Sequence, residues 1–95
     1  MKNETELRNL NFELSRIEAL RKISRSLHHL AEVSCNYGLT PRQETREKNL
    51  LKKAETLAAE IGLKIYHQGD PRGCALYLLS EDMNVNNYSS GIALV

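Results

Sequence analysis

The feature that most constrains the fold of this sequence is a long N-terminal stretch without glycine or proline. Residues 4 to about 34 contain neither, and apolar side chains recur along them at helical spacing, so the stretch predicts one long helix. Its apolar residues fall into two sets. The first set has the 3-4-3 spacing of a short coiled-coil seam and consists of Leu7, Leu10, Leu14 and Ile17. The second set consists of Leu20, Ile23, Leu27 and Leu30.

These two sets point to different sides of the same helix. At about 100° per residue, their mean directions differ by roughly 140°. A short helix hairpin covers only one such face, so we expect residues 19–95 to form a core domain that buries the second set. Residues 1–18 would then project and pair with another copy, giving a homo-oligomer. The alternative is a single wide stripe bent around one core.

A second helix is predicted by the residues that begin and end it. Gly38 is suited to the left-handed cap that ends the first helix. Thr40, Pro41 and Gln43 then match an N-cap, a first-turn proline and the third position of a capping box. Gly62 is placed to end this second helix.

After Gly62 the apolar pattern changes to a period of two, which is typical of strands. Residues 63–66 predict a first strand, residues 74–79 a central strand that is apolar on both faces, and residues 91–95 a last strand. Residues 80–90 are polar and predict a loop. The expected fold is therefore a single α+β domain, 1–95, with a helix hairpin packed on a small three-stranded antiparallel sheet in the order ααβββ.

Composition and spacing exclude several classes of function. The net charge of +1 gives no overall attraction to nucleic acid or to a membrane surface, and no apolar run approaches the roughly 20 residues of a membrane span. Cys35 and Cys74 form no CxxC motif, which favours a reduced cytoplasmic protein. No zinc-ligand spacing is present, so we expect no metal and no cofactor.

The best candidate for a working site is the turn at residues 69–73. Asp70, Pro71 and Gly73 occupy preferred positions of a type I turn, so the segment is either a well-made hairpin loop or a ligand-binding tip. The planar fork of Arg72 suits phosphate or carboxylate, and flanking glycines allow close approach to the backbone. The candidate binding residues from this region are Gln68, Gly69, Asp70, Arg72, Gly73 and Tyr77.

A basic stripe on the first helix is the second candidate. Arg21, Arg25 and His28 recur on one side of the helix, and Lys22 and His29 lie beside them without an intervening acid. Such a stripe is either a solvated surface or, if the turn folds back beside it, a second wall of the binding site.

Two sequence elements resemble those of small phage and prophage proteins, which pair a Glu-x-x-Cys-Asn element with a Gln-x-Asp-Pro-Arg-Gly element. Here these elements are residues 32–36 and 68–73, and the similarity covers about residues 25–80. The resemblance implies a phage origin and residence in the host cytoplasm. It also marks a joint site formed by Glu32, Cys35, Asn36, Gln68, Asp70 and Arg72.

These observations lead to two hypotheses about function. The first is a non-enzymatic, phage-encoded protein that binds or sequesters a small anionic, nucleotide-like ligand, such as a host immune signal. Arg25, His28, Glu32 and Asn36 of the first helix would join the turn residues in its pocket. The second is a protein-binding inhibitor of a host defence or replication factor. An enzyme built on Cys35, with His67 and Asn36, is the least supported hypothesis, because adjacency of Cys35 and Asn36 in the sequence is not the geometry of a catalytic triad.

Overall fold

The computed structural model describes residues 4–95, with side chains from Glu13 onward. Two helices precede a three-stranded sheet, which confirms the predicted α+β class and ααβββ order. The elements are α1 (Glu4–Tyr37), α2 (Pro41–Glu60), β1 (Leu63–His67), β2 (Leu76–Ser80), the 3-10 helix η1 (Val85–Ser90) and β3 (Ile92–Leu94).

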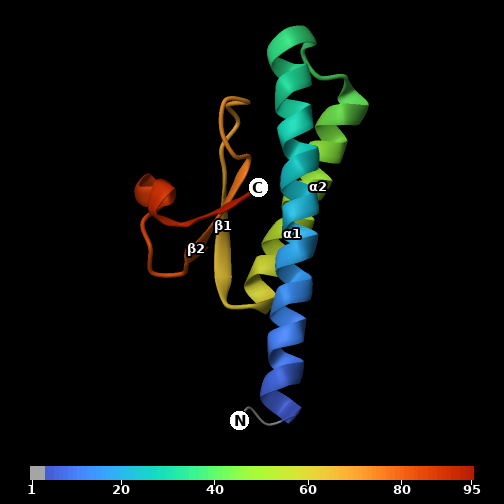
Figure 1. The fold of residues 1–95 in the computed structure, drawn as a ribbon. Helices are drawn as coiled ribbons and strands as arrows, with labels where there is room; N and C mark the ends of the chain where they lie inside the picture. The colour runs from blue at the N-terminus through green and yellow to red at the C-terminus, as the bar shows by residue number, and fades with distance from the viewer. Residues whose placement is uncertain (1–3) are drawn as a thin grey trace.

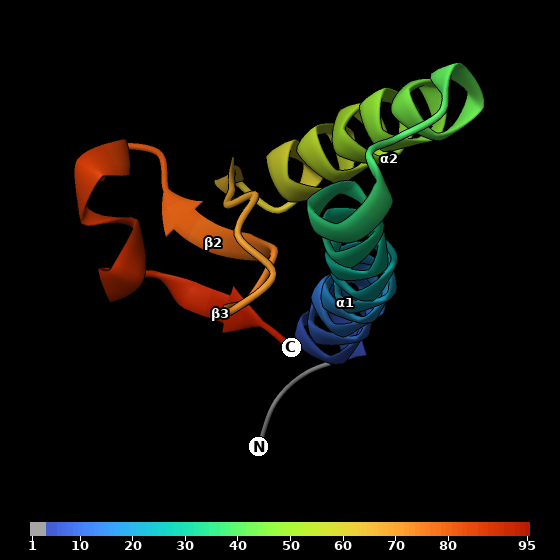
Figure 2. The same ribbon diagram turned by 90° about the horizontal axis from the view of Figure 1, so that it is seen from above.

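The sheet is an antiparallel meander in the order β1-β2-β3. One of its faces packs on the helix hairpin, with α2 against β1 and α1 against β3. Figure 1 shows the sheet beside the two helices, and Figure 2, seen from above, shows it lying to one side of the hairpin. The fold therefore has two layers, helices and sheet, with the core between them.

The core is built on the second apolar set of α1. Its four members are only 0 to 6% exposed, as predicted. Small residues of α2 allow the two helices to approach closely, and alternate residues of the sheet close the other side. The buried residues opposite α1 are Ala54, Ala58, Leu76, Leu78 and Leu94.

The exposure of the first apolar set of α1 changes along the helix. Leu14 is 53% exposed, whereas Ile17 is partly buried and packs against the core. The core therefore begins at Ile17, before the boundary expected from the sequence, because Ile17 lies one turn before Leu20 on the same face. The side chains of Leu7 and Leu10 lie outside the described residues. The N-terminal part of α1 extends past the sheet, and the molecule is 53 Å long (Figure 1).

The helix ends follow the predicted chemistry. Thr40 caps α2 by accepting from the Gln43 backbone N–H at 3.2 Å, while its own N–H donates to the Gln43 side-chain oxygen at 2.9 Å. Gly38 and Gly62 have φ of +76° and +73°, a region that favours glycine. Helix α1 ends at Tyr37, about three residues later than the sequence indicated.

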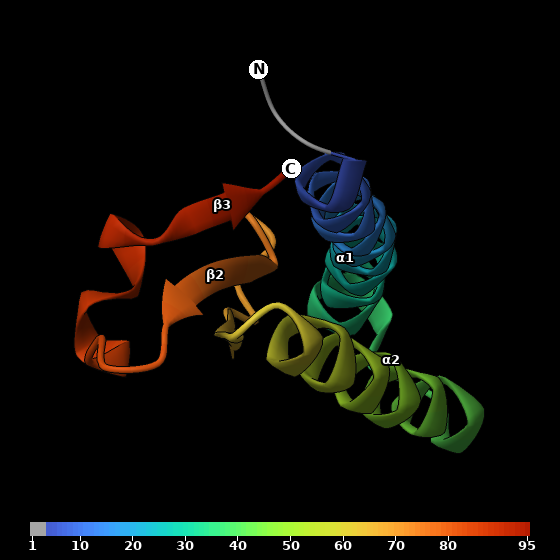
Figure 3. The same ribbon diagram turned by 90° about the horizontal axis from the view of Figure 1, so that it is seen from below.

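The polar loop expected at residues 80–90 contains the short helix η1. Asn84 caps it, and Tyr88 stacks on Tyr66 at a ring-centroid distance of 4.3 Å and meets Tyr77 edge-on at 5.1 Å. Because Tyr66 and Tyr77 are cross-strand partners, they present an aromatic surface that η1 covers. Figure 3 shows η1 on the side of the sheet away from the helices.

Gly91, between η1 and β3, is required for steric reasons. A Cβ there would meet Leu79 Cδ2 and lie 2.5 Å from the Leu78 carbonyl oxygen. We therefore expect Gly91→Ala to lower the free energy of unfolding by about 1–3 kcal/mol, measured by urea denaturation. Gly69→Ala is the matched control, since its Cβ meets nothing within 4 Å and the expected change is under about 0.5 kcal/mol. Equal stability of the two variants would contradict this account.

Candidate functional site

The turn after β1 is fixed mainly by its own side chains. Asp70 Oδ1 accepts from the Arg72 backbone N–H at 2.9 Å, and the Asp70 carbonyl accepts from the Gly73 N–H at 3.4 Å. The Gln68 side-chain oxygen accepts from the Asp70 N–H at 2.7 Å. The segment is therefore the well-made turn that the sequence indicated, and it presents Pro71 and Arg72 at the tip of the hairpin.

The guanidinium of Arg72 is bound to its neighbour Asp70. Arg72 Nε lies 3.1 and 3.0 Å from the two carboxylate oxygens, and Nη2 lies 2.7 Å from Oδ2. The Arg72 side chain, followed by its backbone N–H, lowers the pKa of Asp70 from an ordinary 3.8 to about 2. The Arg72 side chain is 89% exposed and reaches into solvent, and its ion pair with Asp70 places a negative charge beside it at the tip.

His28 connects the turn to α1. Its Nε2 lies 2.8 Å from the Pro71 carbonyl oxygen, and its Nδ1 lies 3.2 Å from a Glu32 carboxylate oxygen. Because a carbonyl and a carboxylate can only accept, both ring nitrogens face acceptors. His28 and Glu32 thus hold the turn beside the helix.

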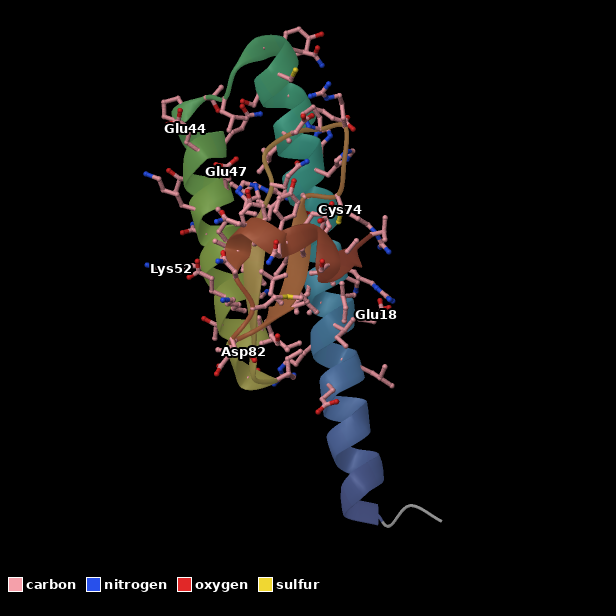
Figure 4. All side chains as sticks on the ribbon, turned by 90° about the vertical axis from the view of Figure 1, so that its left-hand side faces the viewer. Glu18, Glu44, Glu47, Lys52, Cys74 and Asp82 are labelled. Carbon is pink, nitrogen blue, oxygen red and sulfur yellow. The ribbon has the colours of Figure 1, made fainter. Side chains whose placement is uncertain are left out.

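Beneath the turn, two donors converge on one carbonyl of the C-terminal strand, one from α1 and one from the segment that precedes β2. Ser24, which is 2% exposed, donates from its hydroxyl to the Leu94 carbonyl oxygen at 2.6 Å. The Cys74 thiol approaches the same oxygen at 2.8 Å and the Leu76 oxygen at 3.0 Å. Figure 4 shows Cys74 on a segment that passes in front of α1. These contacts join α1, the segment before β2 and the last strand directly beneath the turn.

Between α1 and the turn lies a cleft of about 340 Å³, which we call the turn cleft. Its polar and basic wall comes from α1 and the turn, and its apolar wall comes from the turn and the last strand. The lining residues are Ser24, Arg25, His28, Pro71, Arg72, Gly73, Cys74, Ala75, Leu94 and Val95.

The turn cleft contains four of the ten predicted binding residues, namely Arg25, His28, Arg72 and Gly73. Three others, Gln68, Gly69 and Asp70, build the turn rather than line the cleft. Glu32 contacts His28 and does not line the cleft, and Asn36 is exposed near the end of α1, where its amide donates to the Glu32 carbonyl at 3.0 Å.

Tyr77 does not join this group. Its β2 neighbours Leu76 and Leu78 face the helices, so Tyr77 points to the opposite face of the sheet, where it meets Tyr88. The sequence could not distinguish the two faces of β2, because both are apolar. Ser24 was not predicted as a lining residue. Its position as a polar residue among the buried apolar residues of α1 could have indicated a buried hydrogen bond.

No protein-family model, no curated protein and no solved structure matches this chain. Among the described residues, no three His, Cys, Asp or Glu side chains come together as ligands for a metal ion. Neither helix, over the residues described, has the apolar length needed to cross a bilayer.

The Asp70–Arg72 pair makes a direct prediction about titration. Carbon-detected NMR of the carboxyl groups should give a pKa for Asp70 of about 2, and Arg72→Gln should raise it toward 3.8. Because the folded-state pKa lies below the ordinary value, ionised Asp70 favours the folded turn above about pH 4. That contribution is lost as the pH falls through about 2.

Arg21→Gln is the matched control for this titration. It removes an exposed arginine that pairs with Glu18 at 3.2 Å and has no hydrogen bond or ion pair with the described residues of the turn. The Asp70 titration should be unchanged in this variant. An Asp70 pKa that stays near 2 in Arg72→Gln would show that Arg72 is not the cause of the shift.

Proposed function

We propose that this protein is a non-enzymatic binder of a small organic anion of nucleotide-like chemistry, and that the ligand occupies the turn cleft. The observation that carries the proposal is the lining of this cleft. It contains two arginines and a histidine but no aspartate or glutamate side chain. Its volume of about 340 Å³ falls in the range of small-molecule sites.

Arg25 is the principal anion-binding group in this proposal. Its guanidinium has no hydrogen bond or ion pair with any other residue whose side chain the structure describes. An incoming phosphate or carboxylate therefore gains a charge-assisted, bidentate partner without breaking an existing pair. Arg72 plays a smaller part, because Asp70 already accepts from its Nε and Nη2 and a ligand would share this guanidinium with the carboxylate.

The remainder of the cleft suits the uncharged part of such a ligand. Pro71, Ala75 and Leu94 line it with apolar surface. A mainly apolar wall with a few fixed polar groups is the usual composition of small-molecule sites. A ribose or base would pack on this wall while its phosphate meets Arg25.

Binding rather than catalysis is favoured by the partners of the reactive groups. The Ser24 hydroxyl and the Cys74 thiol are directed at the Leu94 carbonyl, not at a base. His28 faces the Pro71 carbonyl and Glu32, so it is not aimed at either nucleophile. Nucleophilic catalysis needs such a base within hydrogen-bond reach.

The resemblance to phage proteins suggests a biological role for this binding, namely sequestration of a host signal. A phage protein in the host cytoplasm that binds a nucleotide-like ligand tightly would lower the free concentration of a host immune signal. Sequestration needs only affinity and preorganised donors, and the turn held by His28 and Asp70 supplies such a preorganised wall.

The test of the proposed function compares Arg25→Gln with Lys22→Gln. Lys22 is an exposed cation one turn earlier that does not line the cleft, so it controls for net charge. Wild type should show a ligand-dependent rise in melting temperature with at least one member of a panel of linear and cyclic nucleotides. Arg25→Gln should weaken binding about tenfold or more by calorimetry, since a charge-assisted hydrogen bond contributes about 1.5–3 kcal/mol.

The absence of any shift across the panel would contradict the ligand proposal. The protein-binding alternative would then be the better account. Its most evident contact residue is Tyr37, an 89% exposed aromatic side chain at the end of α1.

We also infer that the protein self-associates through the N-terminal part of α1. This part extends past the sheet in Figure 1. Leu14, a member of the first apolar set, is 53% exposed. Leucine on a projecting helix at coiled-coil spacing gains stability by packing against a second copy. The expected interface is the seam of Leu7, Leu10 and Leu14, with Ile17 at its inner end.

Light scattering tests this interface. Wild type should exceed the monomer mass of 10.8 kDa at high concentration, and Leu14→Glu should reduce the mass toward it. Ser15→Glu places the same charge on the neighbouring exposed position and should leave the assembly intact. A wild-type mass of 10.8 kDa at all concentrations would rule out the seam.

A further inference from the structure

A second cleft lies on the other flank of α1, between this helix and the first turns of α2. We call it the hairpin cleft, and its volume is about 430 Å³. Its lining residues are Arg25, Ser26, His29, Leu30, Gln43 and Arg46.

Arg25 belongs to both clefts because of its position on the helix. The buried residues Leu20 and Leu27 lie on the side of α1 opposite Arg25. At about 100° per residue, Ser24 and His28 lie roughly 60–100° to one side of Arg25, and Ser26 and His29 lie roughly 40–100° to the other. Arg25 therefore stands on a ridge between the two clefts, one facing the turn and the other facing α2.

The hairpin cleft has the same charge character as the turn cleft. Its lining includes no carboxylate side chain. His29 and Arg46 make no hydrogen bond or ion pair with the rest of the chain from Glu13 to Val95. The Gln43 side-chain oxygen accepts from the Thr40 N–H, which leaves its amide nitrogen as a donor. The donors of this cleft are thus available to an anion.

We propose that one ligand carrying two separated phosphate groups spans the ridge, with one phosphate in the turn cleft and the other in the hairpin cleft. This inference rests on the proposed function and narrows the ligand to dinucleotide-like molecules. Two separate anions would compete for the single guanidinium of Arg25. Joining them in one molecule makes the contact of the second phosphate with the hairpin cleft, Arg46 included, intramolecular, which raises the overall affinity.

The assignment gives Arg46 a role that differs from that of Arg25. Arg25 contacts the ligand whichever cleft it occupies. Arg46, which lies on α2, contacts only the second phosphate. Its removal should therefore affect two-phosphate ligands selectively, which a general loss of positive charge would not do.

The experiment is calorimetric titration of wild type, Arg46→Gln and Lys48→Gln with two sets of probes. The probes are the four nucleoside 5′-monophosphates and dinucleotides with two phosphates, both 5′-phosphorylated linear forms and cyclic forms. At least one dinucleotide should bind wild type at least tenfold more tightly than its monophosphate. Arg46→Gln should remove that difference while the monophosphate affinity stays unchanged. Lys48→Gln, an exposed charge on the same helix, should behave as wild type.

If monophosphates and dinucleotides bind equally, or if Arg46→Gln weakens neither set more than the other, the spanning ligand is wrong while the turn cleft remains a binding site. If no probe binds at all, the proposed function fails as well. Circular dichroism spectra that match wild type establish that the variants are folded.

Discussion

The packing of one stripe of α1 against the sheet and α2 determines the rest of this structure. Burial of the second apolar set fixes the rotation of the helix about its axis, since those side chains are almost fully removed from water. With that rotation fixed, Ser24 and His28 must face the last strand and the turn. Arg25 must lie on the side of α1 opposite the core, on the ridge between the two clefts, and His29 must face α2. The polar side chains of the site are thus placed by the apolar side chains of the core.

Much of this architecture could be predicted from local chemistry. The capping box at Thr40, the left-handed glycine at Gly62 and the turn at Asp70 depend on residues within a few positions of one another, and such rules are readable in a sequence. The direction of Tyr77 and the burial of Ser24 were not predicted. Both depend on which surface of one element meets another, and apolar patterning on both faces of β2 leaves that choice open.

In the proposed site, the unpaired positive charge lies on the helix rather than at the hairpin tip. Sequence reasoning placed the main anion contact at Arg72, but Asp70 is two residues away and binds that guanidinium in the turn itself. The Asp70 carboxylate is held within hydrogen-bond distance of the Arg72 guanidinium by the turn, so a ligand has to compete with it for the same donors. Arg25 has no such neighbour among the described side chains. The turn shapes the cleft, and the helix supplies the available charge.

The central claim is that Arg25 is the shared anion contact of both clefts. Nitrogen-15 NMR of the arginine side chains during titration with a dinucleotide tests it most directly, because each Nε–H resonance reports on its own guanidinium. The account predicts that the Arg25 and Arg46 resonances shift together and saturate at one ligand per protein chain. The resonance of Arg21, which pairs with Glu18, should not shift. Saturable binding that leaves the Arg25 resonance unmoved would contradict it.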